Sequence, residues 1–445
     1  MPPKPSDVVV TGIGVLAAAG IGIDAFWHSL LHGTSGIVSL EHRDEGPTAP
    51  ANWRSSAKAG SWLGGPILKF DAAQFVRPRK ALKVMGRELQ TAYAASTMAI
   101  EMSGLRPAIE SRQIEPDMVA MIFGSQMLYG PASELLDAVK HSMDENHVVT
   151  LDRFGETAMR NIMPLWMLKY LPNMAACHVG ISVGATGPNN TIVSGDVSAT
   201  SAMIESFGVL HRGIASASVC GATGSRIDET YLVYRGDWPT PTVGVDVAHS
   251  SRVHSKNADG VVGAEAASSV VVETRAVAAA RGAKELAVVA GCASRFVPPP
   301  MASENGEPSR GSAEAIRLAI QAAITSSGLS SGDIGLVISH GMGDPLRDAA
   351  ERDALAMTLP EVPICAVAAI NGHSGAALGG VSMVAAVLAL MHKTIPAMPG
   401  YAGDHESIGA RCSTTPRPLT KPAVIVLTHT SHGAANAIVF AQPTP

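Results

Sequence analysis

Twice along this chain, an apolar run that ends in glycine leads into an amphipathic helix. The first run, Asp7–Val15, precedes apolar residues at helical spacing in Ile23–Leu31. The second run, Lys284–Cys292, precedes a similar helix over Ala313–Ser326. Glycine-ended strands that alternate with helices are typical of α/β folds. The repeat therefore predicts two similar α/β units: an N-terminal half over residues 1–275, with a helical cap inserted at about 125–175, and a C-terminal half over residues 276–445.

The composition favours a large core and excludes several classes of protein. Hydrophobic residues make up 46% and charged residues 16% of the 445 positions. A net charge of −5 without a Lys/Arg-rich run excludes the basic surface of nucleic-acid binders. The five cysteines form no CxxC pair, so neither a disulfide framework nor a zinc site is indicated. The first residues lack signal-peptide features, and the apolar stretch Ala376–Met391 is too short and rich in small residues to span a bilayer. We therefore expect a cytoplasmic protein without a membrane span.

Asp196 lies where a strand-like run, Thr191–Val193, meets a helix-like run that starts at Val197. The unpaired N–H groups and the positive dipole end of a helix N-terminus stabilise a negative charge by about 0.3–1 kcal/mol. From its position alone, Asp196 is interpreted as a helix N-cap.

Two histidines, His340 and His373, each follow an apolar strand-like run and are flanked by glycine. Small neighbours let another molecule approach an imidazole closely. Such a histidine donates a hydrogen bond to an oxyanion or acts as an acid or base, and a purely structural role is the alternative. Zinc is disfavoured because no third ligand stands at recognisable spacing, and no metal or other cofactor is predicted.

Seven segments carry a resemblance to a known family, in the order Val8–Val15, Phe26–Gly36, Leu171–Ala176 with Gly187–Val193, Asp259–Ala266, His340–Glu351, Asn371–Gly379 and His432–Phe440. Together they resemble the elongating β-ketoacyl synthases, or ketosynthases, of the thiolase superfamily, which act in fatty-acid and polyketide assembly. The resemblance implies an α/β protein of the thiolase fold. Its two halves would form a duplicated five-layer αβαβα sandwich, usually dimerised through strands of the two central sheets.

The resemblance also implies roles for the residues singled out above. In that family a cysteine at the helix N-terminus takes an acyl chain from an acyl carrier protein, and two histidines assist decarboxylation and hold the enolate. By resemblance, His340 and His373 are these histidines, Glu265 is a buried supporting glutamate, and Asp196 stands at the nucleophile position. Further family residues are replaced: a lysine by Ala368, two pantetheine-binding threonines by Met342 and Asp344, a gating phenylalanine by His432, and another aromatic residue by Val261.

Loss of the thiol leaves three hypotheses for function. A carboxylate that attacked a thioester would form a mixed anhydride at least as reactive, so ordinary acyl loading is not expected. The first hypothesis is a non-condensing chain-length-factor-type subunit that forms a heterodimer with an active ketosynthase and shapes the tunnel for the acyl chain.

The second hypothesis is a malonyl-carrier-protein decarboxylase or an altered acyltransferase that uses His340 and His373. Unless it is protonated, Asp196 at about 4 Å from a malonyl group would raise its energy by roughly 1–4 kcal/mol. The third hypothesis is a non-catalytic homodimer that binds an acyl chain. The expected partners are therefore a ketosynthase subunit or a second copy, an acyl carrier protein and an acyl chain.

Overall fold

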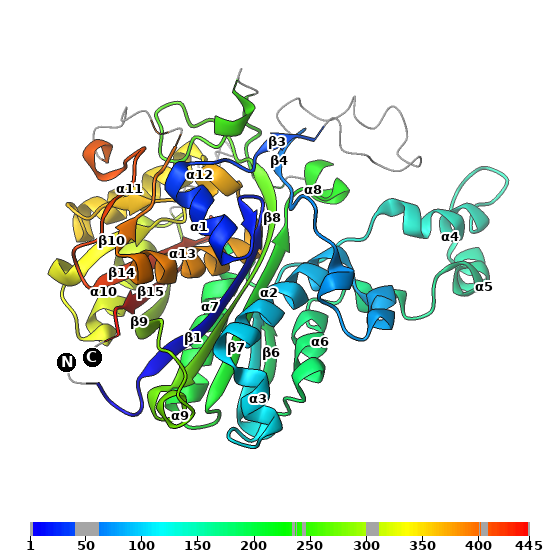
Figure 1. The fold of residues 1–445 in the computed structure, drawn as a ribbon. Coiled ribbons are helices and arrows are strands. Elements are labelled where there is room, and N and C mark those ends of the chain that lie inside the picture. The colour runs from blue at the N-terminus through cyan, green and yellow to red at the C-terminus, as the bar shows by residue number, and fades with distance from the viewer. Residues whose placement is uncertain are drawn as a thin grey trace.

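A single series of hydrogen-bonded strands runs through the centre of the protein (Figure 1). The structure is a computed structural model that describes residues 3–40, 62–233, 236, 238–242, 246–299, 311–399, 401 and 408–443. The strand order is β11-β10-β14-β15-β9-β1-β8-β7-β5-β6. The series divides between β9 and β1 into two halves of five strands each.

The N-terminal half of the series combines antiparallel and parallel pairing. β1 pairs antiparallel with β8 and β8 with β7, whereas β7 with β5 and β5 with β6 are parallel. Every residue of β1 is buried, since it pairs with β8 on one side and β9 on the other. The bounds are β1 (Val8–Ala17), β5 (Val119–Gly124), β6 (Asn189–Ile192), β7 (Ala217–Ser225) and β8 (Gly263–Thr274), with β2 (Gly20–Ile21), β3 (Val38–Ser39) and β4 (Leu63–Gly65) attached at the side.

The C-terminal half repeats this arrangement strand for strand. β9 pairs antiparallel with β15 and β15 with β14, whereas β14 with β10 and β10 with β11 are parallel. The duplication inferred from the two glycine-ended runs is therefore confirmed in the topology. The bounds are β9 (Ala287–Phe296), β10 (Ile334–Ile338), β11 (Ile364–Cys365), β14 (Ala423–His429) and β15 (Ala434–Ala441), and β12 (Thr394–Ile395) pairs separately with β13 (Arg417–Pro418).

Helices complete a five-layer sandwich, as predicted. α7 and α13 lie between the two halves and contact strands of both, while α2 and α6 cover one outer face and α10 and α11 the other (Figure 1). These helices are α2 (Arg87–Ser103), α6 (Met174–Val183), α7 (Ser198–His211), α10 (Ala313–Ser327), α11 (Pro345–Thr358) and α13 (Leu378–His392). The others are α1 (Ile23–His32), α3 (Leu105–Glu110), α4 (Leu136–His141), α5 (Leu151–Asn161), α8 (Glu229–Val233), α9 (Arg275–Ala280) and α12 (Ala368–Asn371).

The central helix α13 is apolar all round because it is covered on every side. In the described part of the chain, Gly375–His392 is long and apolar enough to cross a membrane by composition alone. However, 89% of this stretch is buried inside the protein. A helix that is hydrophobic on all faces is the expected core helix of a large protein, so the prediction of a buried helix at this place is confirmed.

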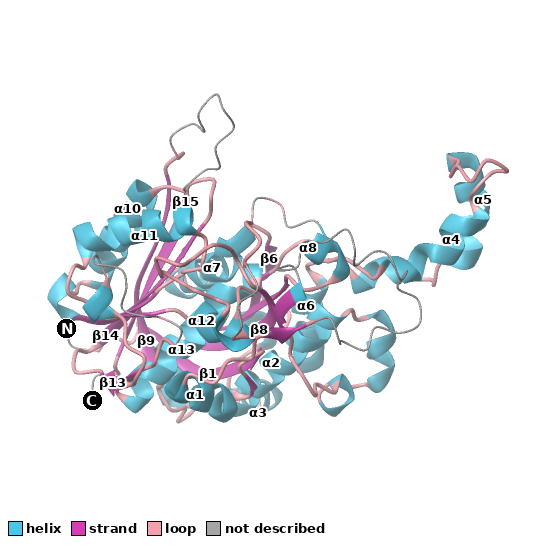
Figure 2. Ribbon diagram, turned by 90° about the horizontal axis from the view of Figure 1, so that it is seen from above, coloured by secondary structure: helices cyan, strands magenta, loops and turns pink. Residues whose placement is uncertain are grey.

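Helices α4 and α5 form an arm that projects away from the sandwich. They pack on each other, and both views show them at a distance from the remaining layers (Figures 1 and 2). Several apolar side chains on and beside the arm are exposed, namely Met127, Tyr129, Val148, Leu151, Leu165 and Met167.

Candidate active site

Three predicted site residues follow the carboxyl ends of parallel strands. Asp196 comes between β6 and α7, His340 follows β10, and His373 follows β11 and α12. Because the two halves share one topology, the β6–α7 and β11–α13 connections are equivalent, and both meet at the centre of the sandwich. Ligands of open α/β sheets bind at the carboxyl ends of the strands.

The structure brings Asp196, His340 and His373 together. One ligand atom from each lies within 4.8 Å of the other two, and all three residues are buried. The Nε2 atoms of the two histidines are 3.3 Å apart. The segments that resemble the histidine motifs therefore converge on the segment that carries Asp196.

His373 has a defined tautomer. The backbone N–H of Gly375 donates to Nδ1 of His373 over 3.2 Å, which leaves the ring proton on Nε2. A Cβ on residue 375 would lie 2.5 Å from Oε1 of Gln126, and its φ is +59°, so only glycine suits this position. His373 therefore carries its N–H donor on Nε2, which faces Nε2 of His340 at the centre of the site.

His340 is held by a residue that the sequence analysis did not single out. The carboxylate of Glu351, on α11, accepts the backbone N–H groups of His340 and Gly341 at 3.1 and 3.0 Å. Glu351 also lies 3.3 Å from Nε2 of His429, at the end of β14. The position of Glu351 at the end of the His340–Glu351 motif is the sequence feature that could have identified it.

Both imidazoles are neutral at neutral pH. Burial, followed by the neighbouring His429 and His373, lowers the pKa of His340 well below its usual value. Burial and the charge of Arg226 do the same for the pKa of His373. Neutral histidines donate a hydrogen bond to an oxyanion without adding a buried charge.

Asp196 does not cap α7. The N-cap position is taken by Val197, without a side-chain capping bond. The Asp196 carboxylate instead forms an ion pair with Arg226, with Oδ1 at 3.7 Å from Nη2. The N-cap interpretation is therefore wrong, because a cation from the end of β7 lies close enough to turn the carboxylate from the helix. Arg226 could have been noticed in the sequence as a basic residue directly after the glycine-rich end of a strand.

Aromatic rings hold the Arg226 guanidinium in place and cover His373. Its Cζ lies 4.4 Å from the ring centre of Trp238 and 4.5 Å from that of Tyr231. Trp238 meets His373 edge to face at 4.7 Å between ring centres. Trp238, Val261 and Met342 form a small buried apolar cluster beside the site. Two of the residues noted as family replacements therefore help to fill the space next to the histidines.

The remaining replacements have structural partners. Asp344 caps α11 by accepting the N–H of Leu346 at 3.0 Å, and it pairs with Arg347 at 3.4 Å. The carbonyl of Ala368 accepts the hydroxyl of Ser251 at 2.7 Å. His432 contacts the hydroxyl of Ser431 at 3.2 Å. At these positions the described contacts serve the chain's own packing.

Glu265 bonds away from the histidines. Its carboxylate accepts two N–H groups of Arg87 and the backbone N–H of Ile67. Its neighbour Ala264 donates its backbone N–H to the carbonyl of His373 at 3.0 Å. Any support that Glu265 gives to the site therefore passes through the backbone of β8, and its supporting role stays a prediction.

The same three side chains, two histidines and a carboxylate, are also a ligand set used by divalent iron and zinc. Asp196 does not stand at a recognisable ligand spacing from the histidines because it is distant from them in the chain. A metal-bound histidine donates its second ring N–H to a neighbour, whereas Nδ1 of His373 accepts one from Gly375. Arg226 adds a positive charge beside the carboxylate. The arrangement therefore fits hydrogen-bond donation by His373 better than metal ligation.

The buried cysteines are not substitute nucleophiles. Cys220 lies on β7, where burial raises its pKa to about 12 despite a hydrogen bond from Ser206. Burial also raises the pKa of Cys365 to about 12. A thiolate is the reactive form of cysteine, so both stay unreactive thiols.

Native protein at pH 8 should therefore resist alkylation by iodoacetamide at Cys220 and Cys365. The half-buried Cys177 should be modified first, since only this thiol group of the three is partly exposed. Peptide mass spectrometry before and after unfolding measures the order, with full labelling of the unfolded chain as the control. Fast labelling of native Cys220 would contradict the assignment.

Two family models match the chain. The first, described as the N-terminal domain of β-ketoacyl synthase, covers residues 5–278, and the second, its C-terminal domain, covers residues 286–402. The chain belongs to the β-ketoacyl synthase family. The resemblance drawn from the seven segments is thereby confirmed, and the chain is a ketosynthase-family protein of fatty-acid and polyketide biosynthesis.

Curated relatives span nearly the same length. The 3-oxoacyl-(acyl-carrier-protein) synthase 2 of Synechocystis sp. is 26% identical over 400 residues, which cover 87% of this chain and 86% of the relative. The tetracenomycin polyketide synthase ketoacyl synthase alpha subunit of Streptomyces glaucescens is 27% identical over 401 residues, covering 88% and 87%.

Solved structures confirm the thiolase-type ketosynthase fold. A type II polyketide acyl carrier protein in complex with its ketosynthase matches with a TM-score of 0.78 and 21% identity, over 99% of this chain and 100% of that chain. The ishigamide ketosynthase/chain length factor matches with a TM-score of 0.78 and 18% identity, over 98% and 99%.

Proposed function

We propose that this chain is a non-condensing subunit of the chain-length-factor type, which pairs with a cysteine-bearing ketosynthase. The observation that carries the proposal is the Asp196–Arg226 ion pair at the position where the family carries its thiol. An ion-paired carboxylate is a weaker nucleophile than a free one, and its acyl product would be a reactive anhydride. The side chain at the nucleophile position is thus unsuited to hold an acyl intermediate.

The surroundings of the histidines support the same proposal. Trp238 lies against His373. Met342 packs against Trp238 in the same buried apolar cluster. By family resemblance, position 342 belongs to the threonines that bind the pantetheine arm of the carrier protein. A buried methionine offers this arm no hydrogen-bonding hydroxyl. Delivery of a thioester to this site is therefore disfavoured, and the chemistry would belong to the partner.

Two exposed features provide a surface for a partner. β6 lies at the end of the strand series, where β5 is its one pairing partner among the described residues. An edge strand offers unpaired backbone groups to a strand of another chain. The projecting α4–α5 arm adds exposed apolar side chains such as Leu151 and Leu165. The solved ketosynthase/chain length factor of similar fold supports this kind of pairing.

A decarboxylase is the second candidate, and the Nε2–H of His373 favours it. Arg226 also removes the electrostatic objection to this activity, because its charge offsets that of Asp196 next to a malonyl group. The cover formed by Trp238 and Met342 counts against it, so we rank it below the partner-subunit function.

Co-expression with a cysteine-bearing ketosynthase of the same genome should give a one-to-one complex that elongates carrier-bound acyl chains. The chain alone should give neither elongation nor an acyl-enzyme, because it lacks a usable nucleophile. Tagged co-purification and mass spectrometry of the carrier protein measure these outcomes.

The control is Asp196→Cys, which should still fail to condense alone because Ala368 and Met342 remain. A stable homodimer that ignores every co-expressed ketosynthase would contradict the pairing. Acetyl-carrier above background from malonyl-carrier and this chain alone would support the decarboxylase instead.

A further inference from the structure

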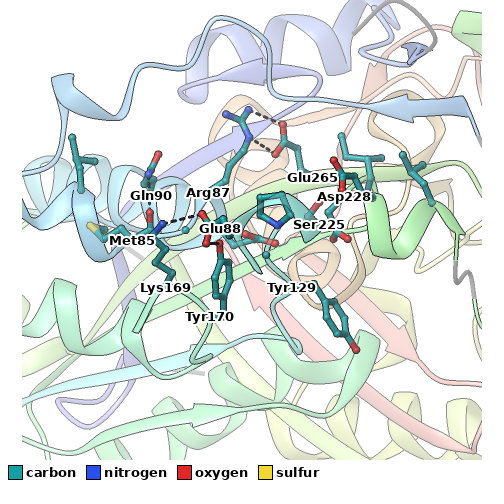
Figure 3. A pocket seen from close by; sticks show the side chains of 18 of the residues that line it. Met85, Arg87, Glu88, Gln90, Tyr129, Lys169, Tyr170, Ser225, Asp228 and Glu265 are labelled. Atoms are coloured by element: carbon teal, nitrogen blue, oxygen red, sulfur yellow. Dashed lines mark hydrogen bonds and ion pairs between the residues drawn. The ribbon is translucent and has the colours of Figure 1, made fainter. Parts of the chain in front are cut away.

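A separate cavity of about 540 Å³ lies on the N-terminal half of the sandwich (Figure 3). Its lining comes from the start of α2, the segment after β5, the segment after β7, and the pair Lys169 and Tyr170. Neither Asp196 nor the two histidines line it. The cavity therefore needs an explanation of its own.

Two of its carboxylates are already satisfied. Nε and Nη2 of Arg87 donate to Glu265 at 2.7 Å each. Glu134 accepts from Nζ of Lys169 at 2.9 Å and from the hydroxyl of Tyr170 at 2.8 Å. Arg87 and Lys169, two of the three basic residues in the lining, are thus used by these pairs, and the third, Lys83, is exposed (Figure 3).

Two other carboxyl groups, those of Glu88 and Asp228, have no such cation. Glu88 is only 7% exposed, and no side chain of the described residues bonds to its carboxyl group. Oδ2 of Asp228 is buried without a hydrogen-bond partner among the described residues. An unpaired carboxylate in such a place is unfavourable unless a cation or a proton accompanies it.

Both carboxyl groups have raised pKa values, although a nearby arginine lowers each of them in part. Burial and the negative potential of Asp228 raise the pKa of Glu88 to about 7. Burial raises the pKa of Asp228 to about 6, although Arg226 lowers it in part. In the absence of a cation, Glu88 therefore holds a proton up to about pH 7, and Asp228 up to about pH 6.

The remaining walls suit an alkyl stem. Met85 and Ile227 are buried apolar residues of the lining. The Arg87–Glu265 pair lies along one side of the cavity, and the rings of Tyr129 and Tyr170 lie along the other (Figure 3). Aromatic faces and aliphatic side chains accept the methylene groups of a ligand, and tyrosine rings also attract a cation.

We propose that this cavity binds an organic cation, an ammonium or guanidinium group on an alkyl stem, with Glu88 and Asp228 as its counter-charges. The cation replaces the proton on Glu88, and its stem lies along the tyrosine rings. This site goes beyond the proposed pairing function, because it requires only the isolated chain.

Calorimetric titration of the isolated chain with n-butylguanidinium and n-butylammonium tests the site. Saturable binding is expected, with 1-butanol, which has the stem without the charge, failing to bind. Affinity should rise with pH through about 7, because the cation displaces the Glu88 proton. At pH 6 the heat should therefore depend on the ionisation enthalpy of the buffer, and at pH 8.5 it should not.

Glu88→Gln and Asp228→Asn should each weaken binding at pH 8 by about tenfold or more, since each removes a charge-assisted hydrogen bond. Glu110→Gln, an exposed acid on α3, is the matched control for net charge and should leave binding unchanged. Equal binding of butanol, no saturable binding, or full binding by both cavity variants would overturn the proposal.

A second experiment distinguishes two sources of the cation, a side chain of the partner subunit and a free amine. If Glu88→Gln also weakens assembly with a co-expressed ketosynthase, a lysine or arginine of the partner subunit supplies the cation. If assembly is unchanged while the free chain binds the probes, the cation is a diffusible amine. Because probe binding is measured without a partner, its failure is separate from failure of the pairing function.

Discussion

Replacement of Glu351 by alanine is expected to lower the free energy of unfolding by about 3–5 kcal/mol. Glu351 is fully buried and accepts the backbone N–H groups of His340 and Gly341. It also lies 3.3 Å from Nε2 of His429. Alanine would leave two buried backbone donors and an imidazole without an acceptor, and each orphaned group costs about 1–3 kcal/mol.

Urea unfolding followed by circular dichroism measures this loss. Glu101→Ala, an exposed position on α2, is the control and should stay within about 0.5 kcal/mol of the parent. Glu351→Gln should fall between the two, because its amide oxygen can still accept one N–H. A loss below about 1 kcal/mol for Glu351→Ala would contradict the assigned network.

The same network has a pH dependence. Burial disfavours the charged form of Glu351, but the hydrogen bond with His429 and the potential of His254 outweigh it and hold its pKa well below the usual value. Stability from this carboxylate is therefore present above the usual carboxyl pKa and is lost as the pH falls below it. The parent should lose more stability on acidification than Glu351→Ala does.

Much of the fold was predictable because it follows from local patterns and their repetition. The glycine-ended runs near Val8 and Ala287 became β1 and β9, which occupy equivalent places in the two halves and pair with each other. The apolar stretch before Met391 became the buried helix α13. The division at residues 275 and 276 and the cytoplasmic location remain predictions.

The site was predictable in its members but not in its contacts. Ordered motifs identified Asp196, His340 and His373, and the fold brings them together. Partner choice depends on side-chain direction across strands that are distant in sequence. Arg226 approaches from the end of β7, and Trp238 reaches His373 from the loop that follows α8. Sequence spacing does not show which distant side chain such a residue will approach, so both residues were missed.

Glu88→Gln is expected to stabilise the protein at pH 8 by about 2–3 kcal/mol and to leave it unchanged at about pH 4. Burial, followed by the charge of Asp228, raises the pKa of Glu88 from its ordinary value of 4.5 to about 7. The folded state therefore holds a proton that the unfolded chain releases, and this favourable contribution is complete below pH 4.5 and is lost as the pH rises through about 7.

Glutamine keeps the size and hydrogen-bonding capacity of the protonated acid but cannot ionise, so it removes the need to bury a charge at high pH. Urea unfolding of the parent and Glu88→Gln at about pH 4, 6.5 and 8 should give curves that coincide at the lowest pH and separate progressively. Glu110→Gln should show no such separation, because this acid is exposed. Parallel curves for the parent and Glu88→Gln would mean that the Glu88 carboxylate already has a cation in the isolated chain. The same variant should also lose binding of n-butylguanidinium. A gain in stability together with a loss of binding is the result expected if Glu88 is a counter-charge for this ligand.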